Sequence, residues 1–290
     1  MGADKTIGLW DLDRLAAVKR IHVVDAFAGP VRAPDTDYFA VAYSPNGQRL
    51  ATANSSGEII VLDATTGKPV QVFPKDLGES GENLGHGPGP IRGLAFRPGR
   101  QELASASWDC TVRIWDLAGR RPPLILRGHA EPVNAVAYAP NGKWLATAGN
   151  DRTVRLWDAD TDHERRPPLV HPEAVLGVAV SPDGTLLASA CNDGIVRLWD
   201  TEDWQQRATL RGHLSGVRAV AFAPEGRRLA SAGNDWTVRV WRADDGKELT
   251  VLRGHTDRVH GLAFSRNGRT LASAGYDGTV KLWDAASWGD

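Results

Sequence analysis

A tryptophan that recurs at a fixed spacing constrains this chain more than any other feature of its sequence. Five tryptophans in the 290 residues stand 42 residues apart: Trp115, Trp157, Trp199, Trp241 and Trp283. Two related endings precede them at wider spacings: Trp10-Asp11 and Leu62-Asp63. A period of roughly 20 to 50 residues is typical of proteins in which each unit buries its core only by stacking on its neighbours. The sequence therefore predicts a repeat protein.

The residues between successive tryptophans predict four short strands. In one repeat, alternating apolar residues at 133–138 precede the turn Pro140-Asn141-Gly142, a second strand at 144–148 and a third at 153–157. A fourth strand is expected near 124–127 in one repeat and near 209–211 in another. No segment keeps the 3.6-residue period of a helix. Four strands in about 42 residues are typical of a propeller blade, so we expect an all-β fold.

The sequence resembles the WD40-repeat family. It contains the Gly-His pairs of that family at Gly128-His129, Gly212-His213 and Gly254-His255, together with the repeated Trp-Asp endings. The resemblance covers almost the whole chain. It implies a β-propeller of four-stranded antiparallel blades, formed by residues 1–290 as a single domain.

The number of blades is open at this point. Six full repeats begin near residues 38, 91, 133, 175, 217 and 259, and residues 1–24 contain only part of a repeat. We favour a seven-position ring in which the part-repeat takes one position, with a six-bladed ring as the alternative. The family closes its ring with an N-terminal strand, which predicts that residues 18–24 complete the last blade. A third alternative is that the chain is a piece of a longer protein. Two connectors, at 25–37 and 74–90, are longer than the others.

A His, a Ser or Thr, an Asp and a Trp recur together in the repeats. The sets are His129, Thr147, Asp151 and Trp157; His171, Ser189, Asp193 and Trp199; His213, Ser231, Asp235 and Trp241; and His255, Ser273, Asp277 and Trp283. A catalytic triad needs one such arrangement beside one substrate, so several copies argue against catalysis. The resemblance implies that each set is a hydrogen-bonded tetrad that stabilises one blade. The repeat that ends at Leu62 lacks the His and has Ser56 in place of the Asp, so we expect it to be the least stable full blade.

If the tetrads are structural, binding depends on positions that vary between repeats. Such positions are the residues next to the Asp of each tetrad, which lies in the turn before the third strand. The second residue of the first, inner strand of each repeat is another. The candidates are Arg92, Trp108, Asn134, Asn150, Asn192, Arg218, Asn234, Trp236, Arg258, His260 and Tyr276. Arg, Trp and Tyr often contribute most of the binding energy at protein interfaces. We call the surface formed by the His-containing connectors and the Asp-containing turns the connector face, and expect a peptide or protein to bind there.

Two narrower binding modes follow from the same candidates. Three arginines, Arg92, Arg218 and Arg258, suit an acidic or phosphorylated peptide. Three aromatic residues suit a methylated lysine, but Trp108 belongs to a blade well separated from those of Trp236 and Tyr276. We therefore favour a general peptide or protein site.

Composition excludes several other classes of function. The 34 Lys and Arg residues balance 35 Asp and Glu residues, so we expect neither nucleic acid nor membrane as a partner. Cys110 and Cys191 form no C-x-x-C pair, and we expect no metal and no cofactor. No apolar run spans a bilayer and the N-terminus is acidic, which predicts a cytoplasmic protein.

The expected function is a non-catalytic interaction scaffold. One alternative is the sensor or recruiting part of a larger regulator, and a propeller enzyme is less favoured. Self-association through the incomplete N-terminal repeat is a further expectation, because an open strand edge can pair with a second copy.

Overall fold

The computed structural model describes residues 6–11, 16–22, 38–73, 85–87 and 89–288. Within these ranges the regular structure is β, apart from a short 3-10 helix, η2 (Ala285–Ser287). The chain divides into two compact units, residues 1–134 and 135–290. The long connector at 25–37, and most of the one at 74–90, lie outside the described residues.

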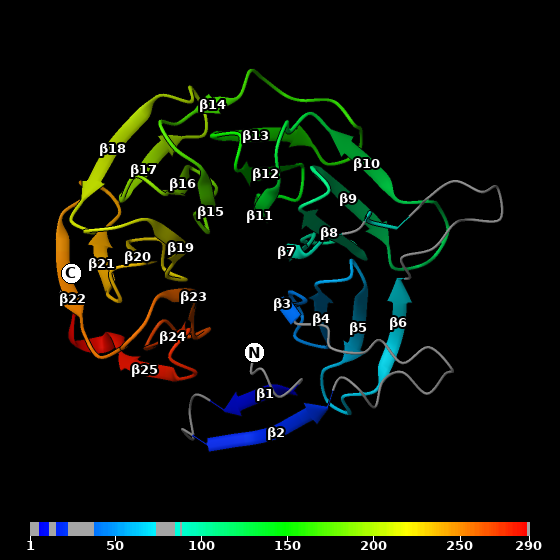
Figure 1. Cartoon of the computed structure of the whole chain (residues 1–290), viewed down its shortest axis with the longest axis horizontal. Coiled ribbons are helices and arrows are strands. Elements are labelled where there is room, and N and C mark those ends of the chain that lie inside the picture. The colour runs from blue at the N-terminus through cyan, green and yellow to red at the C-terminus, as the bar shows by residue number, and fades with distance from the viewer. Residues whose placement is uncertain (1–5, 12–15, 23–37, 74–84, 88, 289–290) are drawn as a thin grey trace. The chain divides into compact units, whose positions relative to one another are not determined.

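The first unit contains one two-stranded sheet and two four-stranded blades (Figure 1). The small sheet pairs β1 (Thr6–Asp11) with β2 (Ala16–His22). The first blade has the order β3 (Tyr38–Tyr43), β4 (Arg49–Asn54), β5 (Ile59–Asp63), β6 (Pro69–Phe73). The second has the order β7 (Ile91–Phe96), β8 (Glu102–Ser107), β9 (Thr111–Asp116), β10 (Leu124–Arg127).

Four further blades follow. The boundary between the two units, after residue 134, falls within β11 (Val133–Tyr138), the first strand of the first of these blades. That blade has the order β11, β12 (Trp144–Gly149), β13 (Thr153–Asp158), β14 (Leu169–Val170). The next comprises β15 (Val175–Val180), β16 (Leu186–Cys191), β17 (Ile195–Asp200) and β18 (Gln206–Arg211). It is followed by β19 (Val217–Phe222), β20 (Arg228–Gly233), β21 (Val238–Arg242) and β22 (Glu248–Leu252). The last has three strands, β23 (Val259–Phe264), β24 (Thr270–Gly275) and β25 (Val280–Asp284).

Local sequence explains where these strands begin and end. The turn from β11 to β12 contains Gly142 at φ +65°, and its N–H donates to the Ala139 carbonyl at 2.9 Å. Glycine reaches this left-handed conformation without the steric cost of a side chain. The strand β14 is short because Pro167 and Pro168 precede it, and proline has no N–H to donate to a neighbouring strand.

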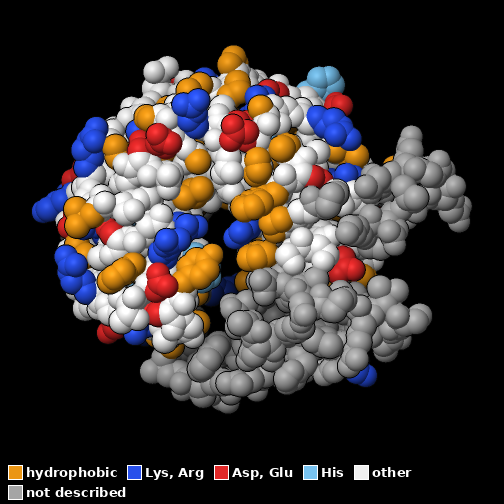
Figure 2. All heavy atoms as spheres, viewed as in Figure 1, with side chains coloured by type: hydrophobic (Ala, Val, Ile, Leu, Met, Phe, Trp, Pro, Cys, Tyr) orange, Lys and Arg blue, Asp and Glu red, His pale blue; other side chains and the backbone are white. Residues whose placement is uncertain are grey.

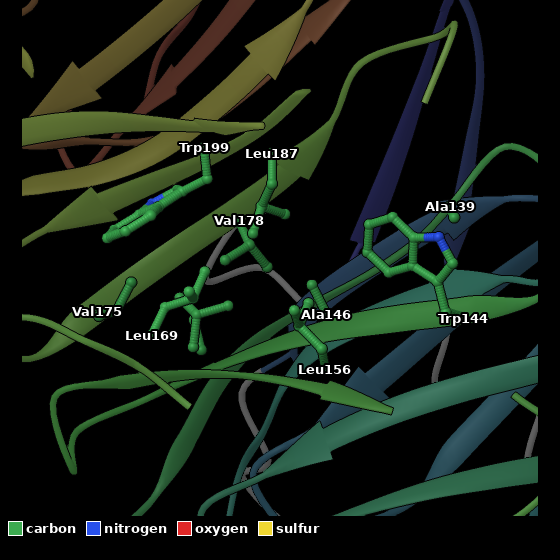
Figure 3. Packing of buried hydrophobic residues seen from close by; sticks show 11 residues of the cluster. Ala139, Trp144, Ala146, Leu156, Leu169, Val175, Val178, Leu187 and Trp199 are labelled. Carbon is green, nitrogen blue, oxygen red and sulfur yellow. The ribbon is translucent and has the colours of Figure 1, made fainter. Parts of the chain in front are cut away.

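The apolar core lies between successive blades. In the second unit, buried side chains of β12, β13 and β14 pack with Val175, Val178, Leu187 and Trp199 of the next blade. Figure 3 shows Leu156, Leu169, Val175 and Val178 grouped between strands of these two blades. Within each unit, neighbouring blades thus bury apolar faces against one another, as the repeat period predicts.

The structure confirms an all-β fold with four-stranded antiparallel blades, but the seven-position ring that the sequence favours is wrong. The described residues form six blades and a separate two-stranded sheet. The prediction that residues 18–24 complete the last blade is also wrong, because β2 pairs with β1 and β23–β25 stay three-stranded. Only residues 12–15 separate β1 from β2, so this pairing costs far less loop-closure entropy than pairing β2 with the distant β25.

Candidate functional site

The fullest example of the repeated polar set lies in the blade β19–β22. Trp241 Nε1 donates to Ser231 Oγ at 2.8 Å, and this oxygen lies 2.8 Å from His213 Nε2. His213 Nδ1 lies 3.0 Å from both carboxylate oxygens of Asp235. Because an indole N–H can only donate, the serine hydroxyl gives its own proton to Nε2, and the imidazole proton on Nδ1 is donated to Asp235. The four side chains form one directed chain of hydrogen bonds.

Two other blades contain the same arrangement. In the blade β7–β10, His86 Nδ1 lies 2.9 Å from Asp109, and Ser105 Oγ lies 2.6 Å from His86 Nε2 and accepts from Trp115 Nε1 at 2.8 Å. In the blade β23–β25 the corresponding distances are 2.8, 2.8 and 2.9 Å, within the set His255, Asp277, Ser273 and Trp283. These contacts join the connector, the second strand and the third strand of each blade.

The blade β15–β18 lacks one of these links. Ser189 Oγ lies 2.8 Å from His171 Nε2 and accepts from Trp199 at 3.0 Å, but His171 Nδ1 lies 3.1 Å from the Leu169 carbonyl. Asp193 instead accepts from Arg197 Nη2 at 2.7 Å. The structure therefore does not join Asp193 to His171.

Proline explains this difference. In the three complete sets the residue after the His donates its backbone N–H to the Asp at 3.0 Å; these residues are Gly87, Leu214 and Thr256. The residue after His171 is Pro172, which has no N–H. Without this second bond, Asp193, in the turn before β17, pairs with the guanidinium of Arg197 on that strand. Pro172 is a signal in the sequence from which this departure was predictable.

In the blade β11–β14, Trp157 Nε1 donates to Thr147 Oγ1 at 2.9 Å. Asp151 accepts from the backbone N–H of Thr153 at 3.1 Å and from its hydroxyl at 2.7 Å. The fourth member of this set, His129, is buried and belongs to the first unit.

The blade β3–β6 is organised differently. Thr52 Oγ1 donates to the Ala40 carbonyl at 3.2 Å, and Leu62 replaces the tryptophan. Asn54 accepts from the backbone N–H groups of Ser56 and Glu58 and donates to the Glu58 carboxylate at 2.7 Å. An asparagine thus closes this turn in place of the aspartate, and among the described residues no His side chain is hydrogen-bonded to it.

Burial and hydrogen bonding set the protonation states of these groups. Burial lowers the pKa of His86, and it lowers the pKa of His171 to about 4. Burial alone raises the pKa of Asp109, but hydrogen bonds from His86 and Thr111 outweigh it and hold the pKa of this carboxyl well below its usual range. Both imidazoles are therefore neutral at pH 7.

Solvent access argues against catalysis by these sets. The side chains of Ser105, Ser189, Ser231 and Ser273 are buried beneath tryptophan and histidine, so a substrate has no route to their hydroxyls. Within the described ranges, no three or more His, Cys, Asp or Glu side chains are arranged to hold a metal ion. The same part of the chain contains no helix that is long and apolar enough to cross a bilayer.

The candidate binding residues of the first unit include a stacked arginine. The guanidinium carbon of Arg92, on β7, lies 4.1 Å from the centre of the Phe39 ring and 4.7 Å from that of Trp108. Trp108 lies in the turn between β8 and β9 and is 41% exposed. The sequence did not single out Phe39, which occupies the second place of its inner strand, as Arg92 does in the next blade. Asn134, the third candidate of this unit, is partly buried on β11.

In the second unit the candidates fall into local groups on neighbouring blades. Arg218 Nε donates to Asn234 Oδ1 within the blade β19–β22. The rings of His260 and Tyr276 lie 4.8 Å apart within the blade β23–β25. The strands β15, β19 and β23 contact one another in succession. The remaining candidates of this unit lie at turns or connectors of their own blades: Asn150, Asn192, Trp236 and Arg258.

Three exposed apolar side chains of the second unit's connector face are Leu214, Trp236 and Tyr276. They are 89%, 51% and 52% exposed. Leu214 was missed because its position, directly after the tetrad His, varies between repeats without an obvious pattern. Trp236 has φ +67°, a left-handed conformation that costs a residue with a side chain roughly 1–2 kcal/mol. Figure 2 shows acidic, basic and apolar side chains interspersed over the described blades on the face in view.

Comparison with known proteins identifies the repeat. The family model described as WD domain, G-beta repeat, matches residues 78–116, 120–158, 169–200, 204–242 and 246–284. The periodic tryptophan protein 2 homolog of Mus musculus is 38% identical over 73 residues, 25% of this chain and 8% of that protein. WD repeat-containing protein 1 of Mus musculus is 38% identical over 77 residues, 27% of this chain and 11% of that protein.

The LEC14B homolog of Prunus armeniaca is 25% identical over 143 residues, which are 41% of this chain and 29% of that protein. The chain therefore spans less than a third of each of these relatives. The repeated family matches cover most of the chain, and the blades have the strand order that the repeat period predicts. On these grounds the chain belongs to the WD40 family of WD domain, G-beta repeat proteins.

Proposed function

We propose that this chain is a non-catalytic scaffold that binds a peptide or protein on its connector face. The observation that carries the proposal is the exposure of Leu214, Trp236 and Tyr276 on two neighbouring blades of the second unit. Leu214 and Trp236 flank Asp235, whose carboxylate accepts the Leu214 N–H at 3.0 Å, so they are close in space. Exposed aromatic residues held on a rigid support are typical of interaction sites.

The tetrads support this function by fixing the loops. His213 and Asp235 link the connector that bears Leu214 to the turn that bears Trp236. Asp277 makes the equivalent link beside Tyr276. Loops that are already ordered lose little conformational entropy when a partner binds, so more of the contact energy appears as affinity.

A pull-down with matched variants tests the proposal. The test variant combines Leu214→Ser, Trp236→Ala and Tyr276→Ala. The control is Val70→Ser, because Val70 is 51% exposed but lies on the outer strand β6, beside Pro69, which pairs with Leu62 at the end of β5 away from the Asn54 turn. Circular dichroism and a thermal unfolding curve establish that both variants fold. Proteins identified by mass spectrometry should be retained by the wild type and the control and lost by the test variant. Equal capture by all three rejects the connector face as the binding surface.

The larger size of the relatives supports a related proposal. Since the chain spans only part of each relative, it is suited to act as the sensor or recruiting part of a larger cytoplasmic regulator. Fusing the chain to a reporter enzyme tests this role. Recruitment of the reporter to the captured partner in cells is expected, and recruitment that survives the connector-face substitutions contradicts it.

Self-association is a second candidate, and the edge of β25 favours it. Among the described residues, β25 has no fourth strand beside it. Unpaired N–H and C=O groups on such an edge can pair with a strand of a second copy. Light scattering should then give a mass that rises with protein concentration. A constant monomer mass rejects this candidate.

A further inference from the structure

Within the part of the chain that the structure describes, the guanidinium of Arg92 is held in place by aromatic rings and not by hydrogen bonds. Its guanidinium stacks on Phe39 and Trp108 at 4.1 and 4.7 Å from the ring centres. Among the described residues no acceptor is bonded to any of its nitrogen atoms, and Nε is buried without a partner. Contact with aromatic rings orients a guanidinium through its face and leaves its in-plane N–H donors unused.

The blade β19–β22 shows what normally satisfies an arginine at this position. Arg218 is the equivalent of Arg92 in the second place of the inner strand, and Asn234 is the equivalent of Trp108 just before the turn Asp. There, Arg218 Nε donates to the Asn234 side chain. In the blade β7–β10 the asparagine is replaced by Trp108, which removes the acceptor and supplies a ring. With Trp108 in place of the asparagine, the arginine is held by a ring and its side-chain N–H donors have no acceptor within the blade.

The terminal Nη groups are the donors that a ligand can reach. Nε is sealed from solvent without a partner, whereas Nη1 and Nη2 are not, and the residue as a whole is only partly buried. Two coplanar N–H groups match the two oxygens of a carboxylate in a bidentate pair. Arg92 supplies one positive charge, which a carboxylate balances, whereas sites for phosphorylated residues are usually built from several arginines.

We propose that Arg92 binds the side-chain carboxylate of an Asp or Glu in a partner peptide, end-on through Nη1 and Nη2. The inference rests on the proposed function, since it names the chemistry of one contact on the connector face of the first unit. Trp108, which is partly exposed, offers the neighbouring residue of that peptide an apolar surface.

Trp108→Asn is the decisive variant, because asparagine occupies the equivalent position as Asn150, Asn192 and Asn234. It should fold, and its amide oxygen should accept from Arg92 as Asn234 accepts from Arg218. Arg92→Lys keeps the charge but loses the two-pronged geometry. Arg227→Lys is the matched control, since Arg227 is an exposed arginine outside the connector face.

The assay uses the whole chain and four synthetic peptide pools with a fixed central Glu, Gln, phosphoserine or Ala between randomised positions. The wild type and Arg227→Lys should bind the Glu pool about tenfold more tightly than the Gln pool, as expected for one charge-assisted bidentate pair. Trp108→Asn and Arg92→Lys should lose most of this preference. Equal binding of the Glu and Gln pools, or an undiminished preference in Arg92→Lys, overturns the inference while leaving peptide binding intact. A stronger, Arg92-dependent response to the phosphoserine pool overturns the assignment to a carboxylate.

A titration with acetate separates the inference from the proposed function. NMR signals of the Arg92 side chain, assigned by their loss in Arg92→Lys, should shift with acetate at constant ionic strength. If no pool binds the wild type, peptide recognition fails, and the acetate result still decides whether Arg92 is a carboxylate site. An unchanged Arg92 signal overturns it.

Discussion

Replacing Ser231 by alanine tests whether the tetrads stabilise the blades. The hydroxyl of Ser231 accepts from Trp241 Nε1 and bonds to His213 Nε2, each at 2.8 Å. All three side chains are buried, so water cannot take the place of the hydroxyl. Ser231→Ala therefore leaves two buried polar atoms without a partner.

The expected magnitude follows from these two groups. A buried polar group that loses its partner costs about 1–3 kcal/mol, so Ser231→Ala, which leaves two such groups, should lower the free energy of unfolding by about 2–6 kcal/mol. Urea denaturation with linear extrapolation measures this difference. Hydrogen exchange of the Trp241 indole proton gives an independent readout, because that proton should exchange faster once its acceptor is lost.

Two matched variants make the test specific. Ser231→Thr keeps the hydroxyl, and Thr147 occupies the equivalent position in the blade β11–β14, so this variant should recover most of the stability. Ser215→Ala removes an exposed hydroxyl and should change stability by less than about 0.5 kcal/mol. If Ser231→Ala costs no more than Ser215→Ala, or if the Trp241 proton exchanges at its wild-type rate, the tetrad does not stabilise this blade.

Three further predictions concern other parts of the molecule. Amides of β4 and β5 should exchange with solvent at least about tenfold faster than those of β20 and β21, because among the described residues no His side chain is hydrogen-bonded to the turn between β4 and β5; equal protection measured by hydrogen exchange contradicts this. The pKa of His171 is about 4 when folded and 6.5 when unfolded, so between these values the unfolded state binds the extra proton and stability falls as the pH falls. From pH 7 to 4.5 the loss should be about 2–3 kcal/mol, and His171→Gln should lose correspondingly less over the same interval in urea titrations. Trp236→Gly relieves the left-handed φ of +67° and should raise stability by about 1 kcal/mol while weakening partner capture; a lower urea midpoint shows instead that the ring stabilises the fold.

Much of the blade structure was predictable from the sequence because its causes are local. The strand predicted at 144–148 appears as β12 (Trp144–Gly149), and the one predicted at 153–157 appears as β13 (Thr153–Asp158). Alternating apolar residues and a turn glycine act within a few residues of one another, so their effect is readable without knowledge of distant contacts.

The hydrogen bonds of the polar sets were less predictable. The same four residue types recur around Ser189 and Ser231, yet Asp235 bonds to His213 while Asp193 bonds to Arg197. The choice depends on whether the residue after the His can donate an N–H to the carboxylate. Similar spacing therefore does not guarantee similar contacts, since one missing donor changes which partner is favourable.

The sequence by itself determined the repeat, the four-stranded blade and the family, because a 42-residue period and turn chemistry are properties of the chain alone. Only the tertiary structure decided that β2 pairs with β1 and that Arg92 lies against Phe39 and Trp108. Each of these outcomes is a choice between competing partners. Such a choice depends on loop-closure entropy and on the distances between side chains from different strands, which exist only once the blades have assembled.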